Sequence, residues 1–265
     1  MRRKSYKDDN SYLFMNGKRG QIAIFVIIAL VIIAVVLVVL LYPKLPITQK
    51  AEFTPEGYLR TCIEPSIKEN LNKIADQGGY INPEGYLEYK GDKIKYLCYT
   101  AENYKTCIVQ QPLIKENVEI ELGKLIAGRT EECLQGLKEE YENRGFDVSL
   151  GKSRSEVSIN PGEIRVKFIA PITATKDLAQ RFEQFDIKIN SQIYDLLLTA
   201  TSIIDYESAL GDSETTLYMR YYPNLKIEKT KLSDGSKVYK LSDVSTDERF
   251  RFASRSLSWP PGYGF

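Results

Sequence analysis

Residues 22–41 form an uninterrupted apolar run, which constrains the fold more than any other feature of the chain. As an α-helix, about twenty residues rising ~1.5 Å each match the ~30 Å hydrocarbon core of a bilayer. The run holds no charged or polar side chain, so nothing in it opposes insertion. A core helix of a soluble domain normally keeps a polar stripe. We therefore predict a transmembrane helix over residues 21–42, in contact with membrane lipid.

Basic residues predict the orientation of this helix. More basic residues precede the helix than directly follow it. Only Lys44 and Lys50 follow it closely, whereas the basic residues before it are Arg2, Arg3, Lys4, Lys7, Lys18 and Arg19. Because basic flanks stay on the cytoplasmic side, we expect a cytoplasmic leader over residues 1–20. A linker over residues 43–50 would follow the helix, and residues 51–265 would form an extracellular domain.

A short motif stands directly before the apolar run: Lys18, Arg19, Gly20 and Gln21. It resembles the class III signal peptide of archaeal type IV pilins and archaellins. The resemblance implies that a prepilin-type peptidase cuts after Gly20, so that Gln21 begins the mature chain. Bacterial pilins usually carry a glutamate five residues into the mature chain, where this sequence has Phe25. The alternative is an uncut signal anchor with a basic flank.

In a pilin, the apolar helix first holds the precursor in the membrane and then packs against copies of itself in a filament. Aliphatic side chains can exchange lipid contacts for near-equivalent contacts with neighbouring helices. The residues expected to form this anchor and assembly surface are Ile22, Phe25, Ile28, Leu30, Val35 and Leu41.

The four cysteines are Cys62, Cys98, Cys107 and Cys133. They lack the C-x-x-C spacing of zinc or redox sites, and they lie on the expected outer side, where disulfides persist. Four cysteines allow three pairings. We favour Cys98 with Cys107 across a hairpin, and Cys62 with Cys133 between two helical segments. The alternative is that all four are small buried thiols.

Histidine is absent, which removes Ser-His-Asp and Cys-His nucleophilic sites and histidine-ligated zinc. Basic and acidic residues nearly balance, 36 against 35, so the chain shows no nucleic-acid footprint. We expect no catalytic residue, no metal site, no cofactor and no enzymatic activity.

The sequence after the linker predicts an α+β domain in which helices cover antiparallel sheet. Helical periodicity covers residues 54–78, 112–143 and 187–210. We expect Thr54 to cap the first helix and Pro65 to kink or split it. Gly123 and Gly128 weaken the middle of the second segment, so that one helix and two helices are both compatible with it. Short strands are expected within residues 80–110 and at 146–150, 156–159, 163–169, 225–241 and 250–252. A tight turn is expected at residues 160–162, and residues 225–241 are expected to form a hairpin that turns at residues 233–235. A subdivision near residue 145 is an alternative to one domain.

The last residues, 258–265, hold the only tryptophan together with two further aromatic residues, two prolines and two glycines. Prolines and glycines prevent regular structure, so the rings would dock on the same domain or on a neighbouring subunit.

Two functions fit these features. The first is a non-enzymatic, cell-surface structural subunit of pilin type, anchored or polymerised through its apolar helix. The second is a single-pass, membrane-anchored binding or receptor domain that does not polymerise.

Overall fold

The computed structural model describes residues 18–41 and 53–258. The chain divides into two units, Met1–Glu52 and Phe53–Phe265. Most of the expected leader, the whole expected linker and the aromatic tail after Ser258 lie outside the described residues. The described part of the first unit is one helix, α1 (Lys18–Leu41).

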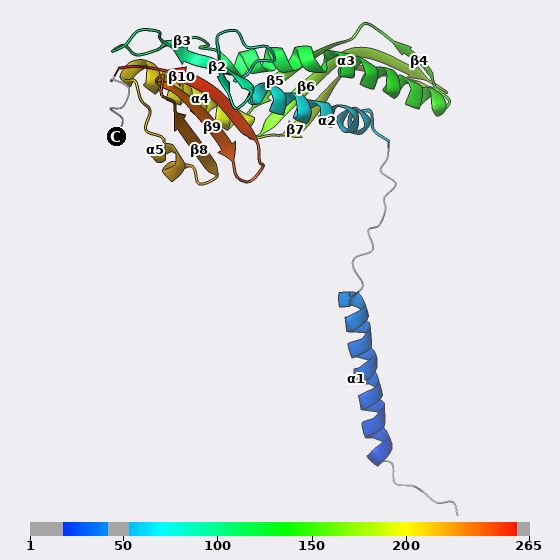
Figure 1. Cartoon of the computed structure of the whole chain (residues 1–265). Helices are drawn as coiled ribbons and strands as arrows, with labels where there is room; N and C mark the ends of the chain where they lie inside the picture. The colour runs from blue at the N-terminus through cyan, green and yellow to red at the C-terminus, as the bar shows by residue number, and fades with distance from the viewer. Residues whose placement is uncertain (1–17, 42–52, 259–265) are drawn as a thin grey trace, which may run out of the picture. The chain divides into compact units, whose positions relative to one another are not determined.

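The second unit has an α+β fold, as expected, and its strands form two sheets (Figure 1). Its described helices are α2 (Pro55–Ala75), α3 (Ile114–Asn143), α4 (Ile193–Leu210) and the short α5 (Thr216–Tyr221). One hydrophobic core joins them to both sheets and contains residues from before and after residue 145.

A six-stranded sheet has the order β1-β2-β10-β9-β8, and β3 pairs with the outer edge of β2. Its strands are β1 (Tyr86–Tyr89), β2 (Asp92–Tyr99), β3 (Ile108–Val109), β8 (Leu225–Lys231), β9 (Ser236–Asp243) and β10 (Arg249–Arg255). The expected hairpin of β8 and β9 and the third strand β10 are both present and antiparallel. The expectation of a purely antiparallel sheet is wrong at one point, because β10 pairs with β2 in parallel. These strands are so distant in sequence that no turn constrains their relative direction.

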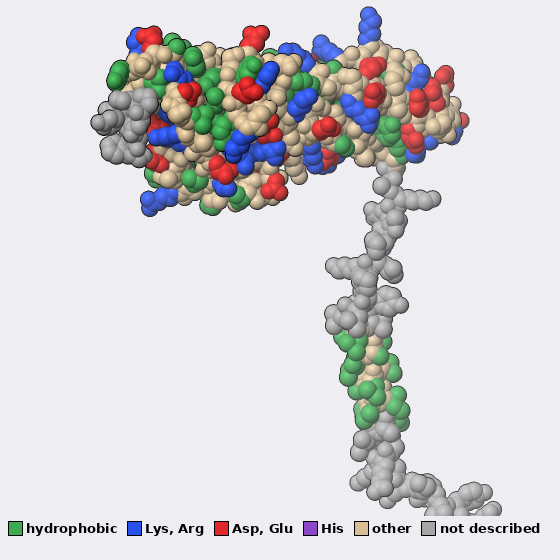
Figure 2. All heavy atoms as spheres, in the orientation of Figure 1, with side chains coloured by type: hydrophobic (Ala, Val, Ile, Leu, Met, Phe, Trp, Pro, Cys, Tyr) green, Lys and Arg blue, Asp and Glu red, His purple; other side chains and the backbone are tan. Residues whose placement is uncertain are grey.

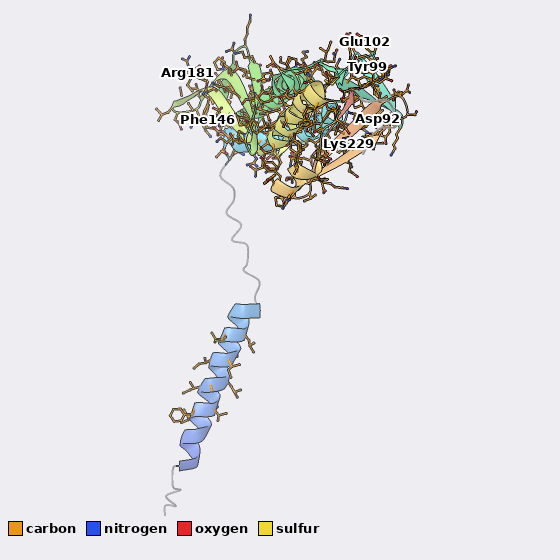
Figure 3. The ribbon with its side chains drawn as sticks, turned by 90° about the vertical axis from the view of Figure 1, so that its left-hand side faces the viewer. Asp92, Tyr99, Glu102, Phe146, Arg181 and Lys229 are labelled. Carbon is orange, nitrogen blue, oxygen red and sulfur yellow. A yellow bond between two sulfur atoms is a disulfide. The ribbon has the colours of Figure 1, made fainter. Side chains whose placement is uncertain are left out.

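A four-stranded sheet is built around one long strand, β6 (Glu163–Thr175). Strands β4 (Asp147–Leu150) and β5 (Arg154–Asn160) pair with β6, and so does β7 (Ala179–Asn190). Every second residue of β6 from Ile164 to Ala174 is buried, which is the pattern of a strand with one face on a core. In Figures 1 and 3 this sheet lies at one end of the unit, with Arg181 on β7, and the six-stranded sheet lies at the other, with Tyr99 and Lys229.

Helix α2 begins where the sequence predicts. The Thr54 side chain accepts a hydrogen bond from the Gly57 amide at 3.1 Å, and Pro55 occupies the first turn. The chain leaves the helix through Gly78 and Gly79, both at positive φ. Of the two expected effects of Pro65, a kink or a split, the split does not occur. The buried stripe, which includes Ile63 and Ile67 on either side of the proline, outweighs one lost hydrogen bond.

The structure also decides the number of helices in the second predicted segment and corrects the start of the third. Helix α3 is a single helix, because the buried stripe of Val118, Leu122 and Ile126 continues past its glycines and fixes the segment against the core. The expected helix from residue 187 begins only at Ile193, and residues 187–190 belong to strand β7 (Ala179–Asn190). In β7, Ile187 and Ile189 are buried on one face and pair with β6, so their spacing of two is a strand signal.

The helices cover the sheets on the core side. Helices α2 and α3 pack against each other, α3 packs on β4 and β5, and α2 packs on β7. Helix α4 lies against β10, β2 and β9 of the six-stranded sheet. The C-terminal end of α4 is thereby brought against β9 and β10, the middle strands of that sheet. Several buried polar residues lie there, namely Glu207, Ser213, Lys237, Ser254 and Ser256.

Candidate functional site

The helix α1 presents apolar side chains on every side. Its side chains are described from residue 24 to residue 37, and all of them are exposed (Figure 2). The expected assembly residues Phe25, Ile28, Leu30 and Val35 lie in this range, with Phe25 71% exposed. The side chains of Ile22 and Leu41 lie outside this range. The expected processing residues, Lys18, Arg19, Gly20 and Gln21, have a helical backbone, and their side chains are also outside the range. A surface with no polar stripe requires an apolar surrounding or an apolar partner.

Across the described residues, no helix is both long and apolar enough to be classed as a membrane span.

Two disulfides stabilise the second unit. Cys62 is joined to Cys133, which ties α2 to α3, and Cys98 is joined to Cys107, which closes the turn between β2 and β3. This is the pairing that the sequence favours. Disulfides persist in oxidising compartments, so the bridges indicate an extracytoplasmic domain.

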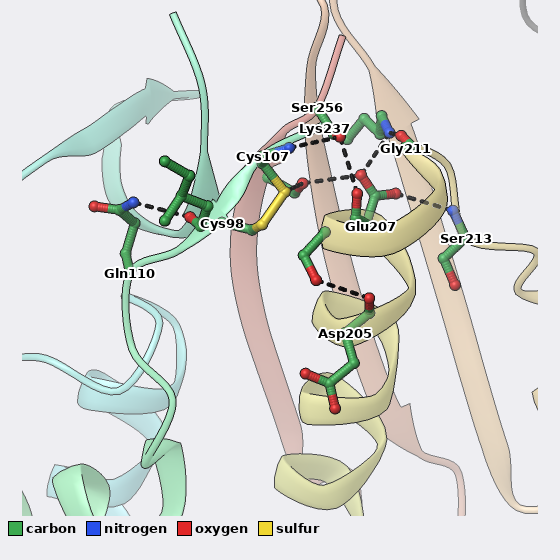
Figure 4. Close-up of a disulfide and its surroundings, with 12 residues drawn as sticks. Cys98, Cys107, Gln110, Asp205, Glu207, Gly211, Ser213, Lys237 and Ser256 are labelled. Atoms are coloured by element: carbon green, nitrogen blue, oxygen red, sulfur yellow. Dashed lines mark hydrogen bonds and ion pairs between the residues drawn. A yellow bond between two sulfur atoms is a disulfide. The ribbon is translucent and has the colours of Figure 1, made fainter. Parts of the chain in front are cut away.

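The least expected feature is a carboxylate in the core, at the C-terminal end of α4. Glu207 is fully buried, and its Oε2 lies 2.6 Å from Nζ of Lys237 on β9. The hydroxyl of Tyr239 donates to Oε1, and the hydroxyl of Ser254 donates to Oε2 at 3.0 Å. The Ser213 amide donates to Oε1 at 3.0 Å. We call these residues the Glu207 cluster; Figure 4 shows its Glu207, Lys237 and Ser213 members.

The Glu207 cluster is connected to one of the disulfides. The hydroxyl of Ser256 donates to the backbone carbonyl of Glu207 at 2.9 Å and accepts from the Cys107 amide at 3.0 Å (Figure 4). The end of α4, the strands β9 and β10 and the Cys98–Cys107 loop therefore share one network of buried hydrogen bonds. Within the described residues the Ser213 hydroxyl oxygen is buried without a hydrogen-bond partner, whereas the Glu207 carboxylate is hydrogen-bonded at both oxygens. A buried polar network of this kind makes the surrounding structure specific.

Charge beside the cluster is balanced by lysines. Burial alone would raise the pKa of the Asp212 carboxyl, but hydrogen bonds from Lys229 and Lys231 and the charge of Lys237 lower that pKa to about 2. Burial raises the pKa of Tyr239, and the negative charge of Glu207 raises it further, so the Tyr239 hydroxyl stays protonated and can donate. The arrangement holds charges in place; it does not offer a reactive group to solvent.

Sequence reasoning missed Glu207, although a signal was present. The buried stripe of α4 includes Ala200, Ile203 and Ile204, and Glu207 continues it at helical spacing. A carboxylate on the apolar face of a helix must find a buried partner, because an unpaired buried charge is costly. The partner, Lys237, could not be identified from local sequence.

A charged hollow of about 440 Å³ lies on the six-stranded sheet, lined in part by arginines of β10. Arg249 makes two hydrogen bonds to the Asp76 carboxylate, at 2.7 and 2.6 Å, and Arg251 lies 2.7 Å from Asp92. These arginines are already paired with carboxylates, so their ion pairs connect α2 and β2 to β10. The described lining of the hollow therefore offers no unpaired arginine to a ligand. Within the described residues there is also no group of three or more metal-ligating side chains.

Comparison with known proteins adds no assignment: no family model, no curated protein and no solved structure matches this chain. The features of the chain that bear on function are therefore the helix α1, the motif before it and the disulfide-bonded unit.

Proposed function

We propose that the chain is a non-enzymatic, pilin-like subunit of the cell surface, anchored and then polymerised through its apolar N-terminal helix. The observation that carries this proposal is the helix α1, whose side chains from residue 24 to 37 are apolar and exposed all around. In the precursor these side chains contact lipid, and in a filament they contact the same helix of neighbouring subunits. The disulfide-bonded unit would lie outside the cell, in keeping with its bridges.

The proposal includes cleavage between Gly20 and Gln21 by a prepilin-type peptidase. Glycine at the cleavage position leaves the backbone open to the peptidase, because it has no side chain. The test is to determine the first residue of the protein purified from its native membrane. Gln21 is expected, and replacing Gly20 with Val should leave the leader attached. Gly17→Val is the matched control, because it adds the same side chain three residues away and should leave processing intact.

Retention of Met1 in the unaltered protein would contradict processing. It would favour the alternative of an uncut anchor that carries a binding domain.

Assembly needs its own test, because a processed protein can still remain a monomer. Surface material sheared from cells should contain filaments, visible by electron microscopy, in which this chain is found by mass spectrometry. Val35→Lys should abolish these filaments, since a charge in the apolar run costs about 3 kcal/mol in lipid and is also unfavourable between packed apolar helices. Processed chains found only as monomers in the membrane would contradict a filament subunit.

A further inference from the structure

Tyrosines line an exposed groove between α4 and α5. The groove has a volume of about 290 Å³, and we call it the tyrosine groove; its lining is Tyr206, Glu214, Leu217, Tyr218, Tyr221 and Tyr222. Tyr221 is 77% exposed and Leu217 is 53% exposed. Helix α5 has no buried residue, and it is held to α4 by a hydrogen bond of 2.8 Å between Tyr218 and Ser202. Such a gathering of exposed aromatic rings marks an interaction surface.

The apolar surface continues along α4 to the end of the helix. Leu210 is exposed and lies one turn beyond Tyr206, on the same side of α4. The surface therefore runs from the tyrosine groove to the last turn of α4.

The last described residues of the chain pass this same turn. Ser256 donates to the Glu207 carbonyl, and the Ser258 hydroxyl donates to the Leu210 carbonyl at 3.3 Å. Leu257 between them is buried. Ser258 is thus held beside Leu210, at one end of the apolar surface.

The chemistry of the tail suits the groove. The tail reads Trp259, Pro260, Pro261, Gly262, Tyr263, Gly264 and Phe265. Consecutive prolines favour the extended polyproline II conformation, which binds in grooves lined by aromatic side chains. At ~3.1 Å per residue, seven residues reach about 20 Å, whereas one helical turn from Leu210 back to Tyr206 is only ~6 Å. The tail is long enough to enter the groove of its own chain.

We propose that residues 259–265 dock in the tyrosine groove of the same chain, with Trp259 and the two prolines against Tyr206 and Tyr221. Docking within one chain is favoured over docking on a second copy, because the short tether gives an effective concentration in the millimolar range. The tail then covers rings that would otherwise face water. The inference does not depend on the proposed filament.

The tail carries a built-in reporter, because Trp259 is the only tryptophan of the chain. In the full-length protein, purified in a non-ionic detergent, Trp259 should emit at short wavelength and resist quenching by acrylamide. The double variant Leu217→Ser with Tyr221→Ser removes exposed groove residues. It should shift the emission to longer wavelength and raise the quenching constant several-fold. Leu178→Ser is the matched control, since Leu178 is 82% exposed at the turn between β6 and β7.

Circular dichroism of each variant shows whether the fold is retained, and the groove residues tolerate substitution because they are exposed. Three outcomes would overturn the proposal. The first is a Trp259 that is fully quenched in the unaltered protein. The second is protection that survives in the folded groove variant, which means that detergent or another surface covers the ring. The third is protection lost on dilution, which means that the tail docks on a second copy.

Discussion

Nζ of Lys237 on β9 lies 2.6 Å from Oε2 of Glu207 on α4, and both side chains are buried. The pair joins the last turn of α4 to the middle of the six-stranded sheet. Removing one partner would leave an unpaired charge in the core, which is far more costly than removing a surface ion pair. The pair therefore fixes the position of α4 relative to strand β9.

The first prediction is that Lys237→Met destabilises the protein by about 3 to 5 kcal/mol, because it leaves the buried Glu207 carboxylate without a cationic partner. Arg154→Met is the matched control, since Arg154 pairs with Glu156 at 3.5 Å on the surface with side chains 71% and 57% exposed. The control should change stability by less than about 1 kcal/mol. The free energy of unfolding of the full chain in detergent, measured with urea, checks both values. Equal small losses would show that the pair is dispensable.

The second prediction concerns the two disulfides. The Cys62–Cys133 bridge spans 71 residues, whereas the Cys98–Cys107 bridge spans 9. In the loop-entropy account, replacing the cysteines with alanine should cost about 4 kcal/mol for the longer loop and about 3 kcal/mol for the shorter one. Unfolding of the two double variants, compared under the same conditions, measures this order. Alkylation of the native protein should label no cysteine unless a reductant is added. Four free thiols without reductant would contradict both bridges.

The third prediction is a loss of stability at acid pH that depends on Asp212. Its pKa is about 2 in the folded chain against an ordinary value of 3.8, so the folded state binds this proton less readily than the unfolded state. The stabilisation is therefore complete above about pH 4 and is lost as pH falls toward 2. Because the side chain is 35% exposed, solvent screening reduces the effect to about 1 kcal/mol.

The measurement is unfolding at pH 5 and at pH 2, in the unaltered chain and in Asp212→Asn. The free energies of unfolding of the two proteins should differ less at pH 2 than at pH 5, because the contribution of Asp212 is lost. Other carboxylates titrate in both proteins, so their effects cancel in the comparison. A difference that stays constant would mean that Asp212 makes no pH-dependent contribution.

The fourth prediction concerns the end of α4. Gly211 has φ +89°, and a Cβ there would stand 2.7 Å from the Ser258 Cβ, whereas Gly162 has φ +76° with nothing within 4 Å. Gly162→Ala should cost about 1 kcal/mol for backbone strain alone. Gly211→Ala should cost about 2 to 3 kcal/mol, because the start of the tail must also move. The melting temperatures of the two variants provide the comparison. Equal decreases in melting temperature would show that Ser258 moves away from the added Cβ without an energetic cost.

Local sequence signals predicted those elements whose causes are local. The cap at Thr54, the turn at residues 160–162 between β5 and β6, and the hairpin of β8 and β9 each depend on residues a few positions apart. Strand β7 was missed because its alternating Ile187 and Ile189 run directly into the periodic pattern of α4. Helix α2 continues through Pro65 and α3 continues through its glycines, because packing of a buried stripe outweighs a local helix breaker.

By itself, the sequence determined the apolar helix, the type of most elements and a favoured pairing of the cysteines, because composition and spacing act over short distances. Only the tertiary structure decided that β10 lies parallel to β2, and that Glu207 meets Lys237 in the core. These contacts join residues far apart in the chain. Their geometry depends on how the whole core closes, and no local pattern carries that information.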